Sequence, residues 1–379
     1  MDARRVAIAL IGAAAVVAAL WAKPDAVRSA SESPRGAVIE RVEAISVGAP
    51  QTYGGLTIFP LTARSIGGLG YLTLDEAMRE KAVEIIEKDG GTVNTVTIHN
   101  RSGRPIFIMD GEEIIGAKQN RVLNTSVLIG AERTAQLPVS CVEQGRWTGA
   151  SMSFKSGGTQ LFARARQSNI PAVNRNYEAS PSAGARSDQS HIWAQVATKR
   201  SNLSMGDASG PMHEAYTTHG GKIDDYVKHF NTVPGQVGAV FAIRGEIVGA
   251  DMFDQSETLT RLFAKMVKSY ALDAIERPYV SSGVREPRTP GVDEARRFVR
   301  LVLEKGVSFK DYSSPGEGRD VRISSPRING AGLVAVGRPV HIALFAPEKP
   351  EPIPLREGGL RPPSQRWRNL PDSPRIINR

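Results

Sequence analysis

Residues 106–117 have the sequence IFIMDGEEIIGA, and residues 240–250 repeat the theme as VFAIRGEIVGA. Each stretch has an apolar run, a turn at glycine, a glutamate, and a second apolar run that ends in Gly-Ala. Apolar runs around such a turn are typical of a β-hairpin. Two interpretations stay open: two hairpins that share turn chemistry, or a duplicated β-unit whose turns face one cleft, where ligands often bind.

Outward from these stretches, strands and helices alternate irregularly along the chain. Apolar residues at three- and four-residue steps from Leu259 to Ile275 predict the clearest helix, and Asp254 is expected to cap it. Further helices are predicted over residues 73–88, 189–203, 223–230 and 293–305, and strands over 93–147 and 321–345. We therefore expect an α+β fold with mixed, mainly antiparallel sheets and three to five packed helices.

The composition is that of an ordinary globular protein, with 379 residues, 41% hydrophobic and 23% charged. The formal net charge of +9 is spread along the chain, so a nucleic-acid partner is disfavoured and an anionic surface is favoured. Cys141 is the only cysteine and excludes an internal disulfide; its apolar strand context favours an inert thiol over a nucleophile.

The N-terminus predicts export. Two arginines precede the uncharged apolar run 6–21, which is typical of a signal peptide or of a retained membrane anchor, and both stay open. We expect a periplasmic protein, or one anchored in the inner membrane that faces the periplasm. The predicted organisation is a signal or anchor (1–22), a linker (23–52), one domain (53–346) with a mobile excursion (149–190), and a disordered Pro/Arg-rich tail (347–379).

Two short segments carry most of the clustered polar residues, 111–121 and 141–147. The candidate acid and base groups are the carboxylates of Glu112, Glu113 and Glu143. The candidate ligand-binding residues are Lys118, Gln119, Asn120, Arg121, Gln144, Arg146, Trp147 and Asp251. Neither a metal site nor a cofactor is expected, because the histidines lack the usual ligand spacing and no phosphate-binding loop is present.

The segments GEEIIGAKQNR (111–121) and SCVEQGRW (140–147) resemble the ARG and rhodanese-phosphatase-superfamily-associated protein domain, a bacterial family of unknown function. Residues 235–253 and 270–273 resemble it too, so the likeness spans about Tyr53 to Phe345. The family name records the domains it occurs with, so the resemblance implies no catalytic residue and instead singles out the two motifs.

Three roles for the motifs stay open. The favoured one is a non-catalytic binding or scaffold module of the cell envelope, with a small anionic or sugar-like ligand or an envelope protein as partner. The alternative is a hydrolase that acts on an anionic or glycosidic substrate, with Glu112 or Glu113 and Glu143 as acid and base, which requires both carboxylates beside one bond. In the third, the motifs are buried networks that hold loops in place.

Overall fold

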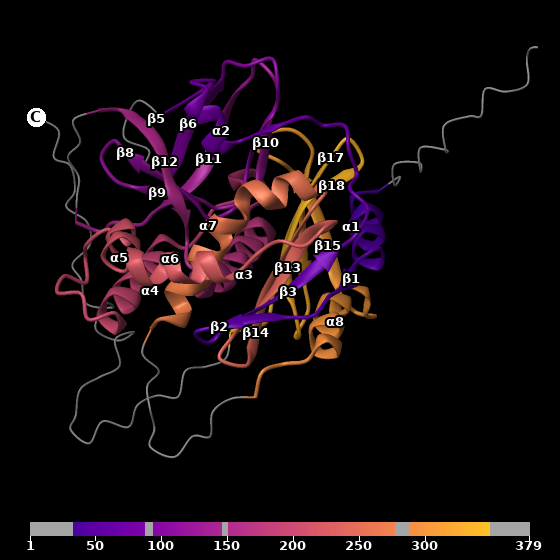
Figure 1. Ribbon diagram of the computed structural model, residues 1–379. Helices are drawn as coiled ribbons and strands as arrows, with labels where there is room; N and C mark the ends of the chain where they lie inside the picture. The colour runs from indigo at the N-terminus through magenta and orange to yellow at the C-terminus, as the bar shows by residue number, and fades with distance from the viewer. Residues whose placement is uncertain (1–32, 88–93, 146–150, 277–287, 349–379) are drawn as a thin grey trace, which may run out of the picture. The chain divides into compact units, whose positions relative to one another are not determined.

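The 240–250 stretch forms the predicted hairpin at the centre of a nine-stranded antiparallel sheet (Figure 1). Arg244 and Gly245 at its turn both have positive φ, 49° and 82°, as a tight two-residue hairpin turn requires. The strand order is β1-β3-β13-β14-β18-β17-β16-β15, and β2 also pairs with β3. The strands are β1 (Ser46–Val47), β2 (Gln51–Tyr53), β3 (Leu56–Thr62), β13 (Gln236–Ile243), β14 (Glu246–Phe253), β15 (Ser308–Ser313), β16 (Arg319–Ser324), β17 (Asn329–Ala335) and β18 (Arg338–Phe345).

This computed structural model describes residues 33–87, 94–145, 151–276 and 288–348. In those ranges it contains eight α-helices, more than the three to five expected, and the α+β class is confirmed. The helices are α1 (Pro34–Glu43), α2 (Leu74–Arg79), α3 (Ala163–Ala179), α4 (Gln189–Asn202), α5 (Met212–Thr218), α6 (Gly220–His229), α7 (Ser256–Ala274) and α8 (Val292–Arg300).

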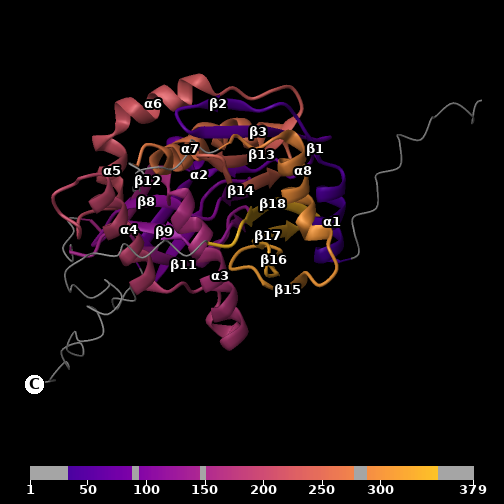
Figure 2. The ribbon, with the colours of Figure 1, turned by 90° about the horizontal axis from the view of Figure 1, so that it is seen from below.

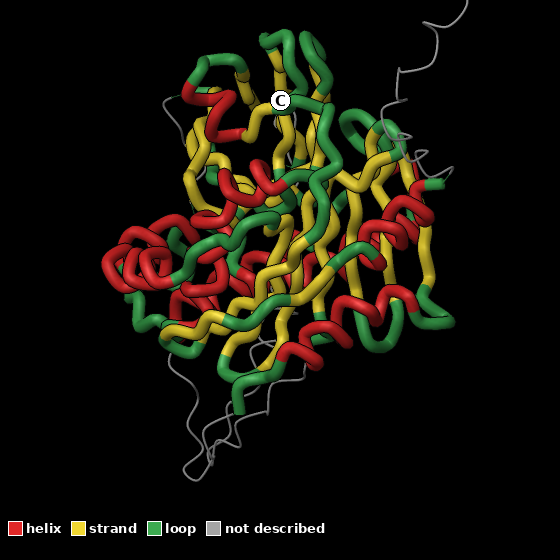
Figure 3. Tube along the Cα trace, turned by 45° about the vertical axis from the view of Figure 1, so that its right-hand side comes forward, coloured by secondary structure: helices red, strands yellow, loops and turns green. Residues whose placement is uncertain are grey.

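Helices cover both faces of the large sheet, as the red helices against the yellow strands show in Figure 3. Along β13, Val240 packs with residues of α1 and α8, whereas the next residue, Phe241, packs with residues of α7. Successive strand residues point to opposite faces, so this fully buried strand serves two cores. Figure 2 shows α1 beside α8 on the first face.

A second group of strands closes into a six-stranded antiparallel barrel of order β11-β6-β5-β12-β8-β9. Its strands are β5 (Val83–Glu87), β6 (Thr95–Asn100), β8 (Glu112–Gly116), β9 (Arg121–Leu123), β11 (Thr134–Cys141) and β12 (Ser153–Gln160). A three-stranded sheet, β10 (Val127–Ile129), β7 (Ile106–Ile108) and β4 (Leu72–Thr73), adds its apolar side chains to the same core. Closure leaves the barrel strands without free edges.

The hairpin predicted for residues 106–117 is wrong. β7 pairs with β4 and β10, while β8 pairs with β9 and β12, so the turn at Gly111 carries the chain from one sheet into another. Tertiary hydrogen bonds outweigh the local turn signal here: the Gly111 amide donates to the Leu123 carbonyl at 2.7 Å. The two similar stretches are therefore not copies of one β-unit.

Two segments expected to lack structure have it. Within the predicted linker, α1 begins at Pro34 behind the Ser33 cap and buries Ala37, Val38 and Val42. Within the predicted excursion 149–190, the described residues form β12, α3 and the start of α4. Polar composition was misleading because α3 buries polar side chains that find partners inside the protein.

Two smaller predictions also change. The Thr73–Glu76 capping box is present, but its helix ends at Arg79 rather than near Lys88, and the alternating Val83 and Ile85 enter β5. Asp254 does not cap α7, because its carboxylate accepts a hydrogen bond from Tyr71. The predicted signal or anchor and most of the predicted tail lie outside the described residues. No helix within the described ranges is long and apolar enough to cross a membrane.

Candidate functional site

Glu112 and Glu113 follow one another on β8 and therefore point to opposite faces of the strand. Glu112 is fully buried; its carboxylate forms an ion pair with Lys265 of α7 and accepts the Met109 amide at 2.8 Å. Burial raises the pKa of Glu112 above its ordinary value, although Lys265 opposes the shift. Lys265 also contacts Asp75 at 2.8 Å, so Glu112 belongs to an ionic link between barrel and helix.

Glu113 is also fully buried and faces α5 instead. Its Oε2 accepts hydrogen bonds from Thr159 and from Nδ1 of His213, the latter at 2.9 Å. The hydrogen bond to Glu113 raises the pKa of His213, against a smaller effect of burial. The two adjacent carboxylates thus fasten different helices to one strand, and they do not face each other.

The remaining polar residues of the first motif lie between β8 and β9 and at the first residue of β9. Arg121 is 1% exposed; its guanidinium donates to the Gln119 carbonyl at 2.8 Å and lies 3.3 Å from Oε1 of Glu87. Asn120 accepts the Gly116 amide at 3.2 Å. Lys118 is the exposed member, with its ammonium group 3.9 Å from Glu87. Gln119 and Arg121 therefore contact protein, and Lys118 alone of these four is largely open to solvent.

The second motif continues from the end of β11. Cys141 is buried, and its backbone amide and carbonyl both form 2.8 Å hydrogen bonds with the Gln189 side chain. Burial raises the pKa of the Cys141 thiol, which is consistent with an inert cysteine. Glu143 is 8% exposed, and the Gln144 amide donates to the Ser209 carbonyl at 3.2 Å. Arg146 and Trp147 lie outside the described residues.

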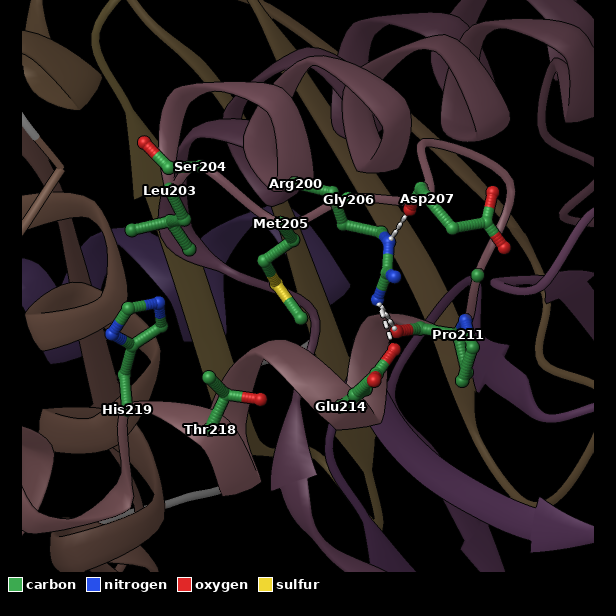
Figure 4. A pocket seen from close by; sticks show the side chains of 11 residues that line it. Arg200, Leu203, Ser204, Met205, Gly206, Asp207, Pro211, Glu214, Thr218 and His219 are labelled. Carbon is green, nitrogen blue, oxygen red and sulfur yellow. Dashed lines mark hydrogen bonds and ion pairs between the residues drawn. The ribbon is translucent and has the colours of Figure 1, made fainter.

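A surface cavity of about 380 Å³ opens beside α5 (Figure 4). The C-terminal part of α4, residues 203–211 and α5 form its walls. Its lining residues are Arg200, Leu203, Ser204, Met205, Gly206, Asp207, Gly210, Pro211, Glu214, Thr218 and His219. No described residue of the two motifs lines this cavity. The candidate residues from the sequence can therefore affect it only through the elements that they hold in place.

Three successive residues join the motifs to the cavity at the start of α5. The Met212 amide donates to the carbonyl of Val142 in the second motif at 3.0 Å. His213 bonds to Glu113 of the first motif, and Glu214 forms a 2.7 Å ion pair with Arg200 in the cavity. Arg200 also donates to the carbonyls of Asp207 and Pro211, which ties the loop over residues 203–211 to α4. Both motifs thus hold the helix that forms one cavity wall.

A comparison with protein families shows which family the chain resembles over most of its length. The model of the ARG and Rhodanese-Phosphatase-superfamily-associated Protein domain matches residues 44–345, which include both motifs and the cavity. The chain belongs to this family. No curated protein and no solved structure matches it significantly. The family has no established reaction. Helix α1, at residues 34–43, lies before the matched region.

In this family domain, Asp251 belongs to a buried network in its centre. Arg166 of α3 bonds to both Asp251 oxygens at 2.8 and 3.1 Å and to both Asp110 oxygens at 3.0 Å. His341 lies 3.1 Å from Asp251. Burial alone would raise the pKa of Asp251, but Arg166 and His341 lower it to about 2. Asp110, Asp251 and His341 offer three ligand atoms within 4.8 Å, yet the Arg166 guanidinium already supplies the cation, which disfavours a metal there.

Several key residues of the family domain escaped sequence analysis. His213 and Lys265 lie 100 and 153 positions from their glutamate partners, and Arg166 lies 85 positions from Asp251. Apart from Arg200 and Leu203, the cavity residues lie between the predicted helices 189–203 and 223–230, in a stretch with no recognised motif. A turn signal at residues 206–211, Gly-Asp-Ala-Ser-Gly-Pro, was the one local cue to the loop that lines the cavity.

Proposed function

We propose that the protein is a ligand-binding module of the cell envelope, and that the cavity beside α5 holds a small sugar-like ligand. The cavity volume lies in the range of about 300 to 1,000 Å³ that is usual for small-molecule sites. The observation that carries the proposal is the triple attachment at Met212, His213 and Glu214, which connects both motifs to the cavity wall.

The lining favours a neutral, hydroxyl-rich ligand over a small anion. Glu214, whose side chain is 50% exposed, offers carboxylate oxygens that accept hydrogen bonds from hydroxyl groups. The charge of Arg200 is balanced by Glu214, and its guanidinium is bound to backbone carbonyls. Leu203 and Met205 provide an apolar surface against which the carbon face of a ring can pack (Figure 4).

The hydrolase alternative has less support. Acid and base catalysis needs two carboxylates that reach one bond, at about 5 to 9.5 Å separation in glycoside hydrolysis. Glu112 and Glu113, the two candidates to pair with Glu143, are both fully buried, and each already has a cationic or hydrogen-bonding partner. These contacts suit a role in stabilising the fold better than one in proton transfer.

The N-terminal sequence supports an envelope location, because the arginines before the apolar run 6–21 favour export of all that follows. A retained run would anchor the module in the membrane, and a cleaved one would release it into the periplasm. Both forms would present the cavity to envelope sugars.

Titration calorimetry of the protein with N-acetylglucosamine tests the proposal. We expect saturable binding that Met205→Trp abolishes, because the larger side chain fills the cavity. Met152→Trp is the matched control, since Met152 is 53% exposed on the barrel and lines no part of the cavity. Absence of binding by the wild-type protein, or equal binding by Met205→Trp, would refute it.

A further inference from the structure

A second, smaller cavity of about 150 Å³ adjoins the first. Its lining residues are Asn202, Leu203, Ser204, His219, Lys222 and Ile275. Three of them, Leu203, Ser204 and His219, line the first cavity too. The two hollows therefore adjoin at the end of α4 and the junction between α5 and α6, and we treat them as two compartments of one groove.

The two compartments differ in charge. The first is lined by Asp207 and Glu214, whose combined charge Arg200 offsets only in part. The second is lined by Lys222, on the first turn of α6, and by no acidic residue among those that the structure describes. A ligand that spans both compartments would meet acceptors at one end and a cation at the other.

His219 stands where the compartments meet. Its Nε2 atom is buried and has no hydrogen-bond partner in the described part of the chain. Burial lowers the pKa of His219 below its ordinary value, and Lys222 lowers it further. A buried polar atom without a partner costs free energy, so a turn of the ring that brings Nε2 into the groove, where a ligand hydroxyl can bond to it, would be favoured.

We propose that the groove binds a ligand of two sugar units, with a hydroxyl-rich unit in the first compartment and a carboxylate-bearing unit beside Lys222. This inference rests on the proposed function, because it extends the same site. The sugar-like part of the predicted ligand would then lie in the first compartment, and its anionic part in the second. An exposed ion pair with Lys222 should add about two- to fivefold in affinity, as surface ion pairs usually do.

The test compares three probes by titration calorimetry: N-acetylglucosamine, its neutral β-1,4-linked dimer, and the disaccharide of N-acetylglucosamine and N-acetylmuramic acid, which carries a carboxylate. We expect both disaccharides to bind at least fivefold more tightly than the monosaccharide, because they occupy both compartments. The acidic disaccharide should bind about two- to fivefold more tightly than the neutral one at low ionic strength.

Lys222→Gln should remove the preference for the acidic disaccharide and leave the affinity for the monosaccharide unchanged. Lys228→Gln is the control, since Lys228 lies on the same helix, is 75% exposed and lines neither cavity. Disaccharides that bind no more tightly than the monosaccharide, or an acidic preference that survives in Lys222→Gln, would overturn this inference and leave the proposed function intact. Absence of binding by all three sugars would refute both.

Discussion

Nδ1 of His213 lies 2.9 Å from Oε2 of Glu113, and this contact fastens the first turn of α5 to barrel strand β8. The carboxylate is fully buried, whereas the imidazole is 26% exposed. A contact at this place affects more than local stability, because the next residue, Glu214, lies in the cavity wall. Changes at the first motif should therefore alter the cavity without contacting it.

The His213 contact predicts a pH dependence of stability. The folded protein has a His213 pKa above the ordinary value of 6.5, so the stabilisation is fully present below about pH 6.5 and is lost as the pH rises through the folded value. Between pH 6 and pH 9, urea denaturation should show a larger loss for wild type than for His213→Gln. Equal losses in the two proteins would contradict this role.

The Lys265 ion pairs predict a large cost when the cation is removed. Lys265→Met leaves Glu112 buried without its cationic partner, which should destabilise the protein by about 3 to 5 kcal/mol. Lys118→Met, which alters an exposed lysine, should stay within about 0.5 kcal/mol of wild type. Denaturation in urea at pH 7 measures both. The prediction is wrong if the two variants lose similar amounts.

The central network predicts sensitivity to acid. The folded pKa of Asp251 is about 2 against an ordinary 3.8, so its contribution is present above about pH 4 and is lost as the pH falls toward 2. Asp251→Asn should be less stable than wild type at pH 5, and the difference should shrink by pH 2.5. Circular dichroism during denaturation at these pH values gives the comparison, and a gap that does not narrow would argue against the Arg166 ion pair as its source.

Because α1 packs on the folded domain, we expect part of the predicted linker to be needed for stability. Arg41 donates to the carbonyls of Arg64 at 2.8 Å and of Asp254 at 3.2 Å, so Arg41→Ala removes charge-assisted hydrogen bonds that join α1 to these distant segments. We expect a loss of about 2 kcal/mol, in the range for such bonds. Glu40→Ala, on the exposed side of α1, should change stability by less than about 0.5 kcal/mol. Thermal denaturation that shows no difference between them would mean that α1 contributes little.

The sequence predicted correctly those elements that are determined by residues close to one another in the chain. The hairpin over residues 240–250, the Thr73–Glu76 cap and the long helix α7 depend on neighbours within a few positions. The stretch 106–117 has the same local pattern, but contacts between its residues and distant strands direct it into two sheets. Helix α1 is stabilised mainly by burial against the large sheet, which no local signal reports.

The candidate site divides in the same way. Sequence singled out Glu112, Glu113 and Asp251 as unusual polar residues, and all three are buried in ionic networks. Their partners His213, Lys265 and Arg166 are far away in sequence, and so is the cavity. Pairings of this kind depend on the tertiary fold and leave no local periodicity to detect.

Methyl NMR of the methionines provides the most direct test of the proposed site. Met205 lines the cavity, Met152 is exposed elsewhere, and Met266 is on α7 and buried in the hydrophobic core. On addition of N-acetylglucosamine to the ¹³C-methyl-labelled protein, we predict a saturable shift of the Met205 signal while the Met152 and Met266 signals stay in place. A saturable shift elsewhere with Met205 unchanged, or no shift at saturating sugar, would contradict the proposal that this cavity is the ligand site.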